Sequence, residues 1–206
     1  MKFQDYPGIG NMLVRVAISK GYCDQYGIKC SLQVVPSGPL GAQAMLAKSI
    51  DASFIPAEIM VGAITKGAKM KMVVGGAVSN TANLIAGNNT QTPNAANGWP
   101  AFMQDLKRKK LGVPARGSLM ETITTWMLLK SGLKAEDVTF VAVGGPVTAY
   151  GALVPKQVDA IAMFEPAPSM CDVLGTCKVI WRGATDKQPA EQYALNGGRA
   201  NLVFTQ

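Results

Sequence analysis

The chain has 206 residues, of which 48% are hydrophobic and 16% are charged, and its formal net charge is +7. This length suits one large domain or two small lobes, and the composition is that of a globular protein. No apolar run reaches the roughly 18 residues that a membrane-spanning helix needs. The chain contains no histidine, which excludes catalytic triads and zinc sites that depend on histidine.

Short strand-like runs alternate with helix-like segments along the whole chain, which is typical of parallel sheets with helices on both faces. The expected strands of the first half lie at 3–6, 31–35, 52–55 and 70–75. Those of the second half lie at 84–86, 111–113, 139–143, 160–164 and 178–181. The final run, ANLVFTQ, is expected to be a strand that returns to the first half.

A weak internal repeat relates the two halves. The stretch AKSIDASFIPAEIM contains Asp51, and PKQVDAIAMFEPAP contains Asp159 in the same context. Gly10 precedes Asp51, and Gly117 precedes Asp159, at nearly the same distance along the chain. The sequence therefore predicts two β-α-β-α-β lobes. Residues 1–80, with 190–206 returning, form lobe 1, and residues 81–189 form lobe 2.

The four cysteines form two close pairs in the sequence, Cys23 with Cys30 and Cys171 with Cys177. Neither pair has the two-residue gap of zinc knuckles or redox motifs. Each pair spans a helix end and the start of the next strand, where the chain reversal can bring the two Cα atoms within disulfide range. We expect two disulfides, and hence an oxidising, extracytoplasmic setting. The alternative is four buried free thiols.

The most basic cluster of the chain is KRKK at 107–110. A basic protein can bind anionic ligands, nucleic acid or acidic membranes. No aromatic or glycine-rich residues are interleaved with this cluster, as they often are on nucleic-acid surfaces. We therefore interpret it as a solvated turn and expect no nucleic-acid partner.

Loops rich in glycine, serine and proline follow six of the expected strands: PGIGN, PSGPLG, IPAE, PARGS, GGPVT and FEPAP. In open α/β sheets, ligands bind beyond the carboxyl ends of the strands, where helix N-termini present free N–H groups. The first loop lacks the third glycine of a dinucleotide-binding fingerprint, because Leu13 stands there, and it also lacks a Walker motif. The six loops would converge on one ligand if the two lobes face each other.

Several polar residues in these loops have two interpretations. Arg116 precedes a helix and suits a carboxylate, sulfonate or phosphate, or it faces solvent. Ser118 and Glu121 match a capping box, so Ser118 is either a helix cap or a ligand contact. Ser37 suits an ordinary helix start. Glu165 ends an apolar strand and is expected to accept a hydrogen bond from a ligand or to bridge to a basic group.

The order and spacing of these motifs resemble ABC-transporter solute-binding proteins of the nitrate/sulfonate/taurine type, within the thiamine-pyrimidine-synthase-like superfamily. The resemblance rests on PG, KGY, YGI, PSGP and IDA in the first half, and on DLKRKKLGVPARGS and VDA…FEP in the second. Phe164 stands where the family usually has tryptophan. The resemblance implies an α/β, two-lobed periplasmic-binding-protein type II fold, in which each lobe is a mostly parallel sheet flanked by helices.

The resemblance also implies a ligand site, carried over by position. Its residues are Pro7, Gly8, Gly10, Asn11, Ser37, Gly38, Pro56 and Ala57 in the first lobe, and Arg116, Gly117, Ser118, Pro146 and Glu165 in the second. It implies no catalytic residue, metal or cofactor. Family members continue with further helices after the strand that resembles ANLVFTQ, so we expect a fragment or an unusually short member.

The function expected from the resemblance is capture of a small, anionic organic solute, such as a sulfonate or carboxylate, for an ABC permease. Such a protein would be a periplasmic, or extracellular and membrane-tethered, monomer. One alternative is an enzyme related to thiamine pyrimidine synthase, which would need an active-site histidine that this chain lacks. Another is the effector domain of a transcription regulator, against which the paired cysteines argue.

Overall fold

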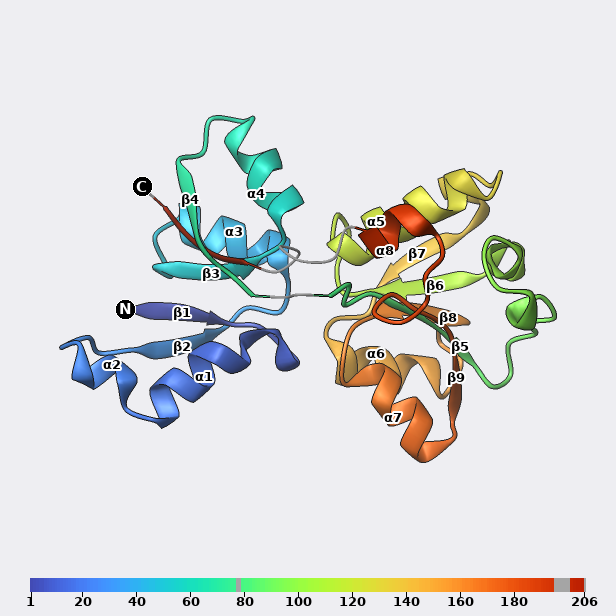
Figure 1. The fold of residues 1–206 in the computed structure, drawn as a ribbon, viewed down its shortest axis with the longest axis horizontal. Coiled ribbons are helices and arrows are strands. Elements are labelled where there is room, and N and C mark those ends of the chain that lie inside the picture. The colour runs from blue at the N-terminus through green and yellow to red at the C-terminus, as the bar shows by residue number, and fades with distance from the viewer. Residues whose placement is uncertain (77–78, 195–200, 206) are drawn as a thin grey trace. The chain divides into compact units, whose positions relative to one another are not determined.

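The computed structural model describes residues 1–76, 79–194 and 201–205 (Figure 1). The chain divides into two compact units. Unit 1 consists of Met1–Val78 and Gly197–Gln206, and unit 2 consists of Ser79–Asn196. The helix at Ala190–Ala194 groups with unit 2. The lobe boundaries expected from the sequence, near residues 80 and 190, remain a prediction. Each unit is described by itself below.

Unit 1 is built around a five-stranded sheet in the order β2-β1-β3-β10-β4. Its strands are β1 (Lys2–Asp5), β2 (Ser31–Val34), β3 (Ala52–Ile55), β4 (Met70–Gly75) and β10 (Asn201–Thr205). Its helices are η1 (Ile9–Asn11), α1 (Met12–Ser19), α2 (Tyr22–Gln25), α3 (Gly38–Leu46) and α4 (Ala57–Ile64). Helix α1 lies on one face of the sheet, and α3 and α4 lie on the other (Figure 1).

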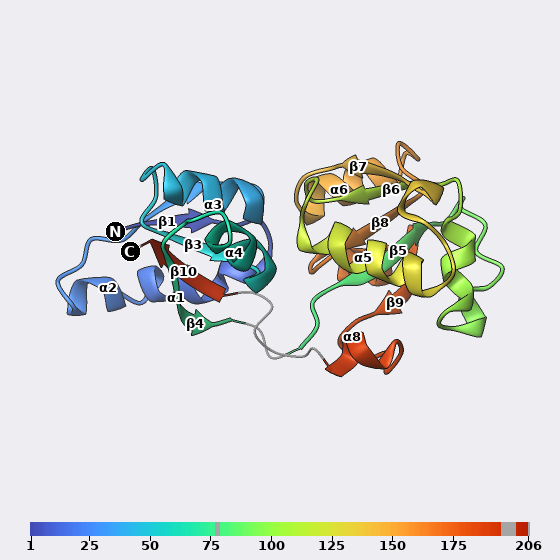
Figure 2. The same cartoon turned by 90° about the horizontal axis from the view of Figure 1, so that it is seen from above.

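Unit 2 repeats this plan with a sheet in the order β7-β6-β8-β5-β9. Its strands are β5 (Asn83–Gly87), β6 (Lys110–Val113), β7 (Thr139–Ala142), β8 (Ala160–Met163) and β9 (Cys177–Arg182). Its helices are η2 (Ala95–Asn97), η3 (Ala101–Leu106), α5 (Leu119–Lys130), η4 (Ala135–Asp137), α6 (Pro146–Leu153), α7 (Ala167–Leu174) and α8 (Ala190–Ala194). Helix α5 covers one face and α6 and α7 cover the other (Figures 1 and 2).

The predicted strands are confirmed to within one or two residues at each end, and the predicted α/β fold class is confirmed. Both sheets are mixed, because one strand in each is reversed. Strand β10 is antiparallel to β3 and β4, and β5 is antiparallel to β8 and β9. Strand β1 is parallel to β2 and β3, and strand β6 is parallel to β7 and β8. Four strands of each sheet thus share one direction.

The internal repeat is confirmed at the level of hydrogen bonds. Lys2 pairs with Ser31 at the start of β1, and Lys110 pairs with Thr139 at the start of β6. The carboxylate of Asp51 accepts from the N–H of Lys2 at 2.7 Å. The carboxylate of Asp159 accepts in the same way from the N–H of Lys110 at 2.9 Å. The repeated aspartates therefore fix the starts of β1 and β6. The same sequence offset relates Lys2 to Lys110, Ser31 to Thr139 and Asp51 to Asp159.

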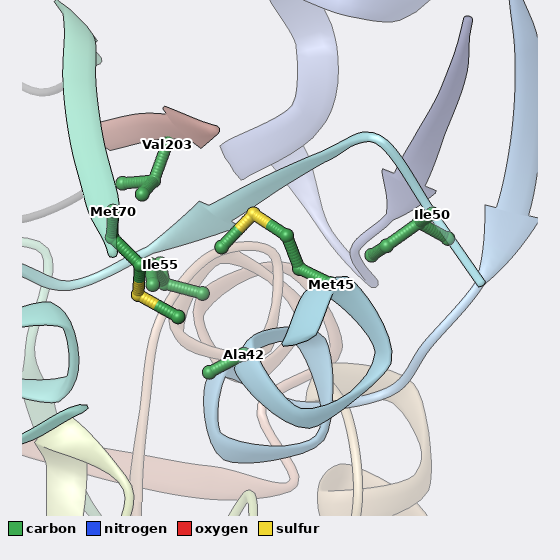
Figure 3. Packing of buried hydrophobic residues seen from close by; sticks show 6 residues of the cluster. All are labelled: Ala42, Met45, Ile50, Ile55, Met70 and Val203. Carbon is green, nitrogen blue, oxygen red and sulfur yellow. The ribbon is translucent and has the colours of Figure 1, made fainter. Parts of the chain in front are cut away.

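The core of unit 1 lies between its sheet and helices α3 and α4 (Figure 3). It contains Ala42, Met45, Ile50, Ile55, Met70 and Val203, which are all buried. These side chains come from α3, the loop before β3, β3 itself, β4 and β10 (Figure 3). Burial of a large apolar side chain contributes roughly 1.5–3 kcal/mol, so this cluster ties the returning strand β10 to the rest of unit 1.

Both predicted disulfides are present. Cys23 is bonded to Cys30 with the two Cα atoms 6.0 Å apart, and Cys171 is bonded to Cys177 with the Cα atoms 4.9 Å apart. The first links α2 to the residue before β2, and the second links α7 to β9.

None of the helices in the described residues has the length and apolar character of a membrane span.

Candidate functional site

The first candidate loop follows β1 and is shaped by two glycines. Gly8 has a φ of 90°, a conformation that other residues avoid because their Cβ would clash. A Cβ on Gly10 would lie 3.4 Å from the Phe54 ring and 3.9 Å from the Tyr6 ring. The loop therefore runs close over two aromatic side chains. Burial raises the pKa of the Tyr6 phenol to about 12, since a phenolate would lose its hydration there.

Asn11, also predicted as a ligand contact, is the N-cap of α1, but its side chain makes no capping bond. Its Nδ2 donates to the Asp5 carboxylate at 3.3 Å, and the same carboxylate accepts from Arg15 at 2.7 Å. Because a carboxylate only accepts, this contact fixes which end of the amide faces Asp5. The opposite atom, Oδ1, is buried and has no hydrogen-bond partner.

The other predicted contacts of unit 1 lie at the starts of α3 and α4. Ser37 caps α3, accepting from the N–H of Leu40 at 3.4 Å, as the sequence predicts. A Cβ on Gly38 would lie 2.8 Å from Ile59 and 3.2 Å from Pro56. Pro56 is the N-cap of α4, and Ala57 is its first residue. The glycine therefore lets the first turns of the two helices approach each other closely.

Gln4, which the sequence did not single out, lies beneath the candidate loops of unit 1 and bonds to two of them. It lies in β1 and is 1% exposed. Its Nε2 donates to the carbonyls of Val35 and Ser37, and its Oε1 accepts from the Ser53 hydroxyl and the Phe54 N–H. A glutamine inside the short strand KFQD is a detectable signal, because long polar side chains are rarely buried unless they are fully hydrogen-bonded.

The first candidate loop of unit 2 places Arg116 against Glu121. The guanidinium Nη2 lies 2.9 Å from the Glu121 carboxylate, and Nε donates to both carboxylate oxygens at 3.0 and 3.1 Å. This hydrogen bond raises the pKa of Arg116. The guanidinium also lies 5.9 Å from the centre of the Phe140 ring. Arg116 is exposed, so it meets solvent as well as its carboxylate partner.

The predicted capping box at Ser118 is wrong. Ser118 is the N-cap of α5, but its hydroxyl makes no capping bond. Glu121 reaches back one residue further than expected and accepts from the N–H of Gly117 at 2.7 Å. Its carboxylate is held there by Arg116, which explains the shift. The Ser118 hydroxyl is buried and has no hydrogen-bond partner.

The remaining predicted contacts of unit 2 lie at the starts of α6 and α7. Pro146 is buried at the first position of α6. The Glu165 carboxylate accepts from the N–H and the hydroxyl of Ser169 in the first turn of α7, at 3.2 and 2.7 Å. Glu165 thus acts as a side-chain cap for α7. Across the described ranges, there is no group of three or more acidic or cysteine side chains placed to hold a metal ion.

Within each unit, the predicted site residues lie at or near helix starts that follow the parallel strands, and their contact with a ligand stays a prediction.

Comparison with known proteins identifies the family. The model of the NMT1-like family matches residues 10–171. The chain belongs to the NMT1-like family. A relative in Brucella abortus (strain 2308), named as a binding protein without a stated ligand, is 29% identical over 170 residues. These cover 82% of this chain and 47% of the relative.

Solved structures share the fold of this NMT1-like chain. The periplasmic aliphatic sulphonate binding protein SsuA from Escherichia coli is 22% identical with a TM-score of 0.70, covering 100% of this chain and 64% of SsuA. The alkanesulfonate-binding protein SsuA from Xanthomonas axonopodis pv. citri, bound to MOPS, is 20% identical with a TM-score of 0.76, covering 100% and 65%. The chain spans about half the length of the curated relatives it matches.

Proposed function

We propose that this chain is the solute-binding part of an ABC import system and that it binds a small anionic organic molecule at helix starts that follow its parallel strands. Support comes from the NMT1-like family, from the sulfonate-binding proteins that share its fold, and from the relative named as a binding protein. The relative and the two solved structures are named as binding proteins, so we propose no catalytic role. The two disulfides fit a periplasmic location, and a membrane permease would be the partner.

The observation that carries this proposal is a pair of unsatisfied helix caps. Asn11 and Ser118 are the N-cap residues of α1 and α5, the helices that follow β1 and β6. Asparagine and serine are favoured N-caps because their side chains normally accept from the first-turn N–H groups. Neither does so here, and their oxygens are the buried side-chain polar atoms without a partner in the described part of the chain. Such atoms are costly unless a ligand or water satisfies them.

An anionic solute suits the start of α5, where no side chain caps the helix, because first-turn N–H groups attract negative charge through the helix dipole. At α1 the Met12 N–H already donates to the Ile9 carbonyl, and the Asn11 Oδ1 can only accept, so this oxygen would meet an N–H or O–H donor of the solute. The net charge of +7 favours the approach of an anion. Arg116 would contribute less to anion binding than an unpaired arginine, because Glu121 already neutralises part of its charge. We therefore expect the backbone N–H groups to carry most of the anion contact.

Native mass spectrometry of the freshly purified protein tests for a co-purified small molecule. In parallel, thermal unfolding is measured with MOPS, with small carboxylates and with neutral sugars. A bound solute at about a hundredfold excess over its Kd should raise the free energy of unfolding by roughly 2–3 kcal/mol. Stabilisation by sugars alone would contradict the anionic class. Turnover of a bound compound would contradict the assignment as a binding protein.

A further inference from the structure

Gln4 uses its full hydrogen-bonding capacity inside unit 1. A glutamine amide has two N–H donors and an oxygen with two lone pairs. The donors reach the carbonyls of Val35 at 2.9 Å and Ser37 at 3.1 Å. The oxygen accepts from the Ser53 hydroxyl at 2.6 Å and from the Phe54 N–H at 3.2 Å. The reverse orientation of the amide would set its oxygen against the two carbonyls, so these partners fix one orientation.

These four bonds join three segments of the chain that the sequence places at the candidate site. Gln4 itself lies two residues before the loop that begins at Tyr6. Val35 and Ser37 belong to the loop between β2 and α3, and Phe54 belongs to the end of β3, just before Pro56. The glutamine therefore fixes the positions of the three loops relative to one another.

The surrounding residues are adapted to this side chain. A Cβ on Gly41 would lie 2.5 Å from both the Gln4 Oε1 and the Ser53 Oγ. Any side chain at position 41 would therefore displace the amide. Ser53 is fully buried, and its hydroxyl has Gln4 as its hydrogen-bond acceptor. The glycine, the serine and the glutamine form one interlocked set.

Unit 2 builds the same register without this polar set. The offset that relates Lys2 to Lys110 also gives the unit 2 counterparts of the polar set. Gln4 corresponds to Gly112, Gly41 to Ala149, and Ser53 to Ile161. A Cβ on Gly112 would lie 2.9 Å from Ile161 and 3.0 Å from Val143, so apolar side chains fill the space that Gln4 occupies in unit 1. The fold therefore does not require a buried amide at this place. Apolar packing of similar volume is often as stable as a buried polar cluster.

We infer that Gln4 is a positioning residue of the proposed solute site, holding the three unit 1 loops in the arrangement that binds the solute. This rests on the proposed function. A fully satisfied polar network specifies one arrangement of its members more sharply than apolar contacts do. Preorganised loops lower the ordering cost that a solute would otherwise meet on binding. Loop positioning therefore explains why unit 1 has a hydrogen-bonded glutamine at the place where unit 2 has apolar packing.

The first test needs no ligand. Amide hydrogen exchange is measured for wild type, for Gln4→Met, and for Gln104→Met as a matched control. Gln104 donates to the carbonyl of Ser131 in unit 2 and lies on none of the three loops. Gln4→Met should speed exchange about tenfold in residues 6–11, 35–38 and 53–57 together, and leave 42–45 of α3 unchanged. An increase confined to 53–54, or one spread evenly over unit 1, would overturn the inference.

The second test replaces the polar set by its unit 2 counterpart, Gln4→Gly with Gly41→Ala and Ser53→Ile. This variant should keep a cooperative unfolding transition and should bind MOPS at least about tenfold more weakly than wild type. Unchanged MOPS affinity in this variant would overturn the positioning role. If wild type itself does not bind MOPS, this sulfonate is not the solute, and the exchange experiment alone decides the role of Gln4.

Discussion

Two serines show that the same residue type at the same helical position has different roles in this chain. Ser37 and Ser118 are both N-caps, of α3 and α5. The Ser37 hydroxyl accepts from the Leu40 N–H, whereas the Ser118 hydroxyl has no partner. At α5 the carboxylate of Glu121, held by Arg116, binds the N–H of Gly117 instead of that of the cap residue. Sequence rules for caps treat the two serines alike, since they do not include the geometry of the first turn.

The two serines give a matched pair of variants. Ser37→Ala should lower the free energy of unfolding by about 1 kcal/mol, the usual value for loss of a serine cap. Ser118→Ala should change it by less than about 0.5 kcal/mol, because no hydrogen bond is lost. Urea denaturation measures both. A larger loss for Ser118→Ala than for Ser37→Ala would show that the Ser118 hydroxyl has a structural partner.

Tyr6 should make stability depend on pH in the alkaline range. Its pKa is about 12 in the folded chain and about 10 in an unfolded chain. Between these pH values the folded state keeps the Tyr6 proton that the unfolded state has lost. Tyr6 therefore contributes its full stabilisation below pH 10, and this contribution falls as the pH rises to 12. The loss should be roughly 2 kcal/mol. Tyr6→Phe should flatten this part of the curve, and an equally steep curve for the variant would exclude Tyr6 as its source.

At the scale of elements, each disulfide closes a short connection between a helix and a strand. The cysteines are 7 residues apart in unit 1 and 6 residues apart in unit 2. Their Cα separations of 6.0 and 4.9 Å lie in the usual disulfide range. The sequence predicted both pairs because each pair spans the end of a helix and the start of the next strand.

Removing either disulfide should have a similar effect. The loop-entropy model gives about 2–3 kcal/mol for closed loops of this length. Cys23→Ser with Cys30→Ser, and separately Cys171→Ser with Cys177→Ser, should each lower the free energy of unfolding by about that amount. Guanidinium denaturation of the two double variants and of wild type measures this. A negligible loss for one pair would mean that its unfolded chain is already compact.

At the scale of the whole molecule, the chain consists of two copies of one supersecondary plan. The strand orders, the reversed strand and the irregularity beside it recur in both sheets. The carboxylates of Asp51 and Asp159 accept equivalent backbone N–H bonds. The repeat seen in the sequence is therefore a repeat of structural contacts and not only of composition.

The two aspartates should therefore be equivalent in energy. Asp51→Ala and Asp159→Ala should each lower the free energy of unfolding by about 1 kcal/mol, the usual net value of one such hydrogen bond. Thermal unfolding of the two variants measures this, with Asp24→Ala on α2 as a surface control. Losses that differ by more than about 1 kcal/mol would show that the repeated bond supports only one unit.

The sequence by itself determined the strands, the two-fold repeat, the disulfide pairs and the family resemblance. These depend on local patterns, namely alternating hydrophobic runs, turn residues and short cysteine spacings, which a linear chain displays directly. The tertiary structure alone decided that both sheets are mixed, that Glu121 binds Arg116 and Gly117, and that Gln4 joins three loops. Those features depend on which distant segments meet, and the bonds of Gln4 reach partners far along the chain, a range at which no local pattern specifies the partner.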